Sequence, residues 1–364
     1  MMNDKNYLIL ENTIKQLGQI DYGTILSTIV LSAACNYTVA KAFQGYTLRK
    51  DYRPKNITQV ALPPELKEDY DSINILDIYK KDFGETIIKF ATTLINRFPP
   101  EVLTNFYNNI NTLKTKEGTF VIRNFLVGNK AVGRYDPKRN TIKIDGENED
   151  ITIFHELFHM ASSIYKDGIE YSGFCQINKK MGTNIGVGIN EGYTELLAER
   201  YFGERDTRIT NSYQYQKFIV KQLEKIVGEE KMESLYFNSN LKGLIEELSQ
   251  YDSEEEIMKF ISNTDFLVKH LDDKKFISNE ADMIGNCLKN VHAFLITNYM
   301  KSVEEKVDKG ILSPKEASYR INHFIGEMIF NLTIHKHRYN LLEKEDLKNC
   351  IETVYGKKEA YSSK

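Results

Sequence analysis

Residues His155-Glu156-Leu157-Phe158-His159 form an HExxH motif in the middle of the chain. On an α-helix, residues four apart lie on one face, about 40° apart around the axis and one turn apart along it. Two imidazoles at this spacing project together and can bind one Zn²⁺ ion in tetrahedral geometry. Glu156 stands beside the first ligand, where its carboxylate can take a proton from an attacking water and deliver one to a leaving amine.

The rest of this helix indicates how it is held. Ile151, Phe154, Phe158 and Ala161 recur every three to four residues, which predicts a buried face opposite the histidines. The plain alternative for HExxH is an amphipathic helix whose polar face happens to carry His, Glu and His.

A third ligand is expected from a second helix at residues 190–200. Asn190 is placed to be its N-cap, and Gly203 lies just beyond its end. Glu191 falls in the first turn and Glu195 one turn later, so Glu191 can bind metal while Glu195 accepts a hydrogen bond from a ligating histidine. The alternative is a solvated acidic stripe that continues to Glu199. Behind an HExxH and a connection of 31 residues, the ligand interpretation is favoured.

HExxH followed by Asn190-Glu191-Gly192-x-x-Glu195 resembles the gluzincins, zinc metallopeptidases whose third ligand is a glutamate, such as thermolysin-like enzymes and zinc aminopeptidases. The resemblance covers residues 119–203. It implies one zinc ion per chain held by His155, His159 and Glu191, with Glu156 as general base for a zinc-activated water. Glu195 would be the outer acid, and the substrate would be a peptide or protein. The substrate-binding residues are not identified, and the recognition motif of the aminopeptidases is not found.

The segment before HExxH has the amino-acid composition of β-strands. Residues 119–127 are rich in β-branched and aromatic side chains, and residues 133–145 suggest a strand, an Asp-Pro turn and a second strand. In the gluzincins, an edge strand above the HExxH helix pairs with the substrate backbone, which here would be Ala131 to Tyr135 or Thr141 to Ile144. Three acidic residues then precede the helix, where they favour its N-terminal end: Glu147, Glu149 and Asp150.

Other polar residues near the motifs stay unassigned. The loop from Gly168 to Gly188 is interpreted either as a mobile flap or as a plain connection. Cys175 in this loop could approach the zinc ion, but the favoured interpretation is an ordinary thiol. A Tyr or His is expected to stabilise the oxyanion, but none of the candidates stands out. They are Tyr165, Tyr171, Tyr193, Tyr201, His270, His292, His323, His335 and His337.

The fold class predicted is α+β and predominantly helical, with a zincin-like core that holds a small antiparallel or mixed sheet. Residues 1–117 are predicted as an N-terminal helical region, 118–205 as the catalytic core and 206–364 as a C-terminal helical domain. A hydrophobic content of 41% in 364 residues suits a globular protein.

Charge and cysteine content limit the possible partners and the cellular location of the protein. The formal net charge of −3 argues against nucleic acid. Four scattered cysteines, Cys35, Cys175, Cys287 and Cys350, favour reduced thiols and a cytoplasmic protein. The stretch 24–43 is the one candidate membrane segment, but its polar residues favour a packed helix. A membrane is therefore not expected as a partner, and the oligomeric state is left open.

Three alternatives to a general metallopeptidase remain. A protease dedicated to one regulatory protein would use the same chemistry, and so would a membrane-associated protease held by residues 24–43. Alternatively, the zinc site is catalytically silent or structural, and the chain acts as a partner-binding module.

Overall fold

The computed structural model describes residues 73–118, 122–123, 130–131, 133–145, 150–203, 213–271, 280–329, 331–334 and 337–362. The stretch 24–43 and the acidic residues Glu147 and Glu149 lie outside these ranges. The chain divides into two compact units. Of the described residues, one unit holds those within 303–327 and 351–362, and the other holds those within 73–302 and 328–350. The HExxH helix and the helices that surround it belong to the second unit.

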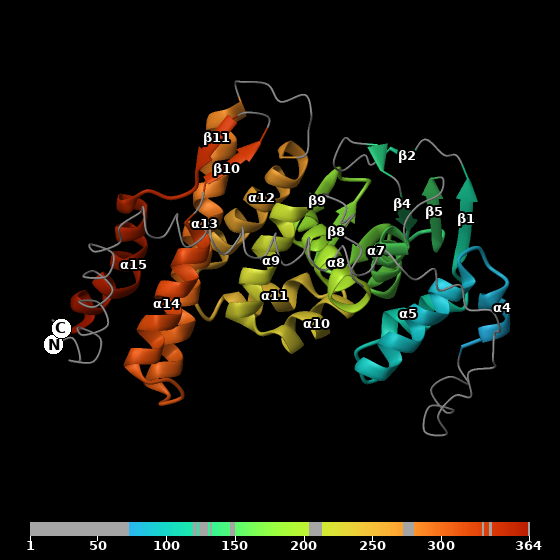
Figure 1. Ribbon diagram of the computed structural model, residues 1–364, viewed down its shortest axis with the longest axis horizontal. Coiled ribbons are helices and arrows are strands. Elements are labelled where there is room, and N and C mark those ends of the chain that lie inside the picture. Colours follow the sequence, from blue (N-terminus) through green and yellow to red (C-terminus); the bar gives the residue numbers. More distant parts are fainter. Residues whose placement is uncertain are drawn as a thin grey trace, which may run out of the picture. The chain divides into compact units, whose positions relative to one another are not determined.

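The described chain is mainly helical with small sheets, which confirms the predicted α+β class (Figure 1). The helices are α4 Ile75–Tyr79, α5 Gly84–Arg97, α6 Thr104–Ile110, α7 Asp150–Ala161, α8 Val187–Phe202, α9 Gln214–Val227, α10 Glu229–Phe237, α11 Leu241–Leu248, α12 Glu254–His270, α13 Ala281–Asp308, α14 Pro314–Met328 and α15 Lys344–Ser362. The strands are β1 Lys114–Gly118, β2 Ile122–Arg123, β3 Lys130–Ala131, β4 Gly133–Asp136, β5 Thr141–Asp145, β6 Ser163–Lys166, β7 Ile169–Ser172, β8 Cys175–Asn178, β9 Thr183–Ile185, β10 Asn331–Ile334 and β11 His337–Asn340. The proposed boundaries at residues 117 and 205 stay predictions.

The sheet nearest to the HExxH helix is mixed, with the order β1-β5-β4. Strand β1 runs parallel to β5 and β4 runs antiparallel to it. The predicted strand, turn and strand are present, and Asn140 closes the turn with a φ of 46°. Of the two candidates for an edge strand, β4 lies at the edge of this sheet among the described strands, whereas β5 is central. Within the predicted strand 119–127, the described part is β2.

The connection between the two motifs contains a β-sheet that is not predicted from the sequence. Strands β6, β7, β8 and β9 form an antiparallel meander, so the interpretation of residues 168–188 as a loop, whether a flap or a plain connection, misses these strands. Glycines with positive φ occupy its turns, among them Gly168 at 83° and Gly173 at 52°. The strands are short and carry polar side chains, so no long alternating apolar pattern marks them.

Aromatic packing fixes the orientation of α7. Phe154 and Phe158 are buried on the predicted face. The ring of Phe154 stacks on Phe202 of α8 at 3.9 Å between centroids, and the ring of Phe158 meets Phe90 of α5 edge-on at 4.9 Å. Each such burial contributes roughly 1.5–3 kcal/mol. The apolar face therefore holds α7 against α5 and α8. Ala161 is buried as predicted.

Helix α8 is buried on almost all sides because two neighbouring helices approach its glycines closely. A Cβ atom at Gly188 would lie 2.3 Å from the carbonyl oxygen of Thr264 in α12. One at Gly192 would lie 2.5 Å from the carbonyl oxygen of Gln216 in α9. Backbone atoms cannot yield as a flexible side chain can, so these positions exclude any side chain.

The N-terminus of α8 is capped from a distant part of the chain. Both carboxylate oxygens of Asp265 in α12 accept hydrogen bonds, one from the N–H of Gly186 and one from that of Gly188, each at 2.8 Å. The helix therefore begins at Val187, and the prediction that Asn190 is its N-cap is wrong. Gly203 follows the last helical residue as predicted.

In the part of the chain that the structure describes, no helix combines the length and the apolar character needed to cross a bilayer. Cys175, Cys287 and Cys350 are free cysteines.

Replacing Gly192 by Ala should destabilise the protein by about 1–3 kcal/mol, because the new methyl group overlaps the α9 backbone. Urea denaturation followed by circular dichroism measures the change. The control is Gly326→Ala in α14, where no atom lies within 4 Å of an added Cβ. That change should leave stability equal or raise it by up to about 1 kcal/mol. Equal effects of the two substitutions would contradict the close approach of α8 and α9.

Candidate metal centre

Helices α7 and α8 bring the three predicted ligands together. The Nε2 atoms of His155 and His159 lie 3.1 Å apart, and the Oε2 atom of Glu191 lies 3.3 Å from the first and 3.6 Å from the second. His155 and Glu191 are buried and His159 is nearly so. These three side chains form a group that can hold a metal ion.

The spacing of the donor atoms fits a small tetrahedral cation. Zinc bonds to nitrogen and oxygen are about 2.0–2.1 Å long, so two ligand atoms at a tetrahedral angle lie about 3.3 Å apart. The three separations bracket this value. Two imidazoles and one carboxylate also match the donor set of zinc sites that keep a fourth position open.

Glu195 orients the first histidine. Its Oε2 atom lies 3.0 Å from Nδ1 of His155, and it is 5% exposed. A carboxylate can only accept here, so Nδ1 of His155 carries a proton, and in the tautomer that binds metal the Nε2 lone pair of His155 would face the ion. This is the outer role that the gluzincin resemblance implies for Glu195.

His159 has weaker orienting contacts. Its Nδ1 atom lies 3.5 Å from the Ser172 hydroxyl and 3.4 Å from the Asn190 amide nitrogen. The Asn190 amide is itself fixed, because its oxygen accepts a hydrogen bond from the N–H of Phe174 at 3.0 Å. Asn190 therefore supports the centre and the turn before β8 instead of capping its own helix.

The charges in the group stabilise one another. Burial alone would raise the pKa of Glu191, but the charges of His159 and His155 and their hydrogen bonds lower it. Burial alone would lower the pKa of His155, yet its hydrogen bonds to Glu191 and Glu195 raise it well above the usual value. Positive charge at the imidazole nitrogens thus stabilises the two buried carboxylates, and a bound metal ion can also supply that charge.

Glu156 lies between the histidines and strand β4. It is 7% exposed, and the backbone N–H of Tyr135 donates a hydrogen bond to its carboxylate. A Cβ atom at Gly133 would lie 3.0 Å from Oε1 of Glu156, so β4 passes directly over this side chain. Burial raises the pKa of Glu156. The carboxylate is held beside the three ligands and against the edge strand.

The acidic stripe of α8 separates into two parts. Glu191 and Glu195 are buried, whereas the Glu199 side chain is 41% exposed and pairs with Lys217 at 2.5 Å. A solvated stripe would leave all three exposed, so that alternative does not describe Glu191 and Glu195.

The remaining candidates lie elsewhere or have other partners. Cys175 packs with Val187 and Val268, and burial raises the pKa of its thiol well above the usual value. The hydroxyls of Tyr193 and Tyr201 donate to Glu224 and Glu233. Three histidines have partners away from the site: His270 near Glu280, His292 at the Met328 carbonyl and His323 near Glu327. Tyr165 and Tyr171 belong to the meander, His337 to β11, and His335 lies outside the described residues.

Three contributors at or beside the centre are not evident from the motifs. The ring of Tyr213 stacks on His155 at 5.8 Å between centroids. The N–H of Tyr135 binds Glu156, and Asp265 caps the ligand-bearing helix. Tyr213 and Asp265 lie far from both motifs in sequence, and Tyr135 acts through its backbone, so no residue pattern marks them.

Comparison of the chain with known protein families, curated proteins and solved structures finds no match. The assignment of the centre therefore depends on its own geometry.

Replacing Glu191 by Ala should remove one ligand and weaken zinc binding by more than about 100-fold, since loss of an outer partner alone costs 10–100-fold. Elemental analysis of the purified protein should find one zinc per chain in the wild type and little in the variant. Glu199→Ala, two turns later on the same helix, is the matched control and should retain zinc. Equal zinc content in both variants would exclude Glu191 as a ligand.

Zinc binding should strengthen with rising pH between about pH 6 and about pH 8, because the metal and a proton compete for the raised-pKa imidazole of His155. Isothermal titration calorimetry in buffers of different ionisation enthalpy measures the protons released. Affinity that stays constant over this range, with no proton release, would contradict the ligand role of His155.

Proposed function

We propose that the chain is a zinc-dependent metallopeptidase with a zincin-like core, and that it hydrolyses peptide bonds in a peptide or protein. The position of Glu156 is the observation that carries this proposal. A purely structural zinc site needs its ligands and their supports, but it does not need a further buried carboxylate beside them. The resemblance of both motifs to the gluzincins points in the same direction.

His155, His159 and Glu191 would hold the zinc ion, and Glu195 would keep His155 in the tautomer that binds metal. When bound, zinc supplies Lewis-acid chemistry, polarising a carbonyl oxygen and making water more acidic. Glu156 would take the proton of the attacking water and pass it to the nitrogen of the leaving amine. The N–H of Tyr135 would orient the Glu156 carboxylate for both transfers.

Strand β4 would align the substrate. One of its edges pairs with β5, and no strand among the described residues pairs with the other. An extended peptide can add to such an edge through backbone hydrogen bonds, which bind any sequence and leave selectivity to side-chain pockets. Because β4 passes over Glu156, a peptide added there would run alongside the base.

Replacing Glu156 by Gln should preserve zinc content and lower hydrolysis by about 10²–10⁴-fold, because the amide cannot accept the proton. The measurement is mass-spectrometric cleavage of a mixed peptide library by zinc-loaded protein, with metal analysis of the same samples. Glu199→Gln serves as the control with the same chemical change on the surface of α8.

A Glu156→Gln variant that cleaves at the wild-type rate would contradict the mechanism. Full zinc content in a wild-type protein that cleaves no peptide in the library would favour a structural zinc site in a partner-binding module. A broad cleavage profile would indicate a general peptidase, whereas cleavage confined to a few sequences would indicate a dedicated one.

A further inference from the structure

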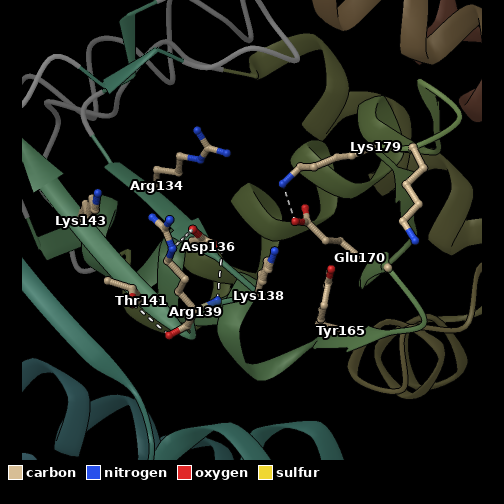
Figure 2. Close-up of a pocket in the computed structure, with 11 residues that line it drawn as sticks. Arg134, Asp136, Lys138, Arg139, Thr141, Lys143, Tyr165, Glu170 and Lys179 are labelled. Atoms are coloured by element: carbon tan, nitrogen blue, oxygen red, sulfur yellow. Dashed lines mark hydrogen bonds and ion pairs between the residues drawn. The ribbon is translucent and has the colours of Figure 1, made fainter.

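A cavity of about 490 Å³ opens between the first sheet and the meander (Figure 2). Strands β4 and β5 and the turn between them form one side, and β6, β7 and the residues after β8 form the other. Figure 2 shows Arg134, Asp136 and Lys143 on the first side and Tyr165, Glu170 and Lys179 on the second. The remaining lining residues are Lys138, Arg139, Thr141, Gly168 and Lys180.

The lining is strongly basic in an acidic protein. Six of the lining side chains are Arg or Lys and two are acidic, whereas the whole chain has a net charge of −3. The overall composition therefore does not account for the positive charge here. Concave walls that carry one sign of charge concentrate the field inside a cavity and attract ions of the opposite sign.

The two acidic side chains are already engaged. Glu170 is 5% exposed and accepts from Lys179 at 2.5 Å, which holds the ammonium group at the cavity. Asp136 caps its own turn by accepting from the N–H of Arg139. Neither carboxylate neutralises the rest of the lining.

Arg134, Lys138 and Lys180 have no acidic partner within the described parts of the chain. An anion from outside the chain can supply the missing charge, and the guanidinium of Arg134 can bind a carboxylate with two parallel hydrogen bonds.

The strand that passes over Glu156 also lines the cavity. Gly133 and Tyr135 face α7, so the side chains of Arg134 and Asp136 point to the opposite face of β4. There, Arg134 stands opposite Lys143 and Asp136 opposite Thr141. Successive residues of a strand are about 3.3 Å apart. A peptide along β4 would therefore pass both Glu156 and the two β4 side chains that line the cavity.

Contacts at the far end of β4 fix the cavity relative to α7. The side chain of Asn140 donates to the carbonyl of Asn109 at 2.7 Å. The side chain of Asn109 donates in turn to the carbonyls of Met160 and Ser163, at 2.9 and 2.8 Å. The turn between β4 and β5 is thereby tied to the C-terminal end of α7, the end that carries His159.

We propose that this cavity is a substrate subsite that binds an acidic side chain, Asp or Glu, close to the bond that is cleaved. The inference rests on the proposed peptidase function and adds its specificity. A single carboxylate suits a cluster of basic side chains gathered around one cavity. A long nucleic acid would need an extended basic surface, and the net charge of −3 opposes it.

Binding tests the subsite independently of hydrolysis. Zinc-loaded Glu156→Gln protein is titrated with fluorescent eight-residue peptides that are identical except for Glu or Gln at one position, which is moved along the peptide. One position should favour Glu by about five- to tenfold, the sum of a few partly exposed ion pairs. This preference should largely disappear at about 0.5 M salt, because screening weakens exposed ion pairs.

Matched variants locate the effect. Lys138→Gln with Lys180→Gln removes two uncompensated charges from exposed positions and should bring the Glu-to-Gln ratio close to one. Lys221→Gln with Lys242→Gln removes two exposed charges outside the cavity lining and should leave the ratio unchanged. The same ratios are then measured as cleavage rates with wild-type Glu156.

The outcomes separate the two proposals. Cleavage of peptides with no preference for Glu at any position would overturn the subsite and leave the peptidase function standing. A Glu preference that the Lys138/Lys180 pair abolishes, in a protein that cleaves nothing, would support the anion site and overturn the peptidase function. If inorganic phosphate or a single-stranded RNA binds through these lysines while Glu and Gln peptides bind equally, the acidic-peptide assignment is wrong.

Discussion

Two carboxylates buried opposite two imidazoles are the constraint around which this part of the molecule is arranged. Glu191 and Glu195 lie inside the protein, where an unpaired negative charge is costly. They are stable there because His155 lies within 3.3 Å of one and 3.0 Å of the other. The arrangement needs α7 and α8 at a fixed separation and rotation. The stacked ring pair of Phe154 and Phe202 holds α7 against α8, and the close contacts at Gly188 and Gly192 hold α8 against α12 and α9.

The local chemistry of the centre was predictable from sequence because helical periodicity encodes it. His155 and His159 share a face of α7, and Glu191 and Glu195 share a face of α8. The strand, turn and strand at residues 133–145 were predictable for the same reason, since alternation and turn residues are local signals. The zinc ion, the peptidase activity and the cytoplasmic location remain predictions.

The features that escaped prediction depend on contacts between distant residues. The meander β6–β9 has little apolar alternation, because its strands are short and partly exposed. The start of α8 was misplaced because its cap comes from Asp265, and a side chain from another helix leaves no local signal. Asn190 has the residue type of a cap, but its amide serves Phe174 and His159 instead. The basic cavity combines residues from β4, β5 and the meander, none of which is unusual in its own segment.

The cap by Asp265 also bears on the order in which the centre can be assembled. During synthesis, all five motif residues leave the ribosome well before α12, yet the N-terminus of α8 lacks its carboxylate until Asp265 has emerged. The surfaces of α8 at Gly188 and Gly192 likewise have no packing partner until α12 and α9 have been synthesised. A nascent chain that ends after α8 would carry both motifs and still lack a rigid centre. Assembly of the site therefore follows completion of the helical layer behind it, because its supporting contacts join residues far apart in the sequence.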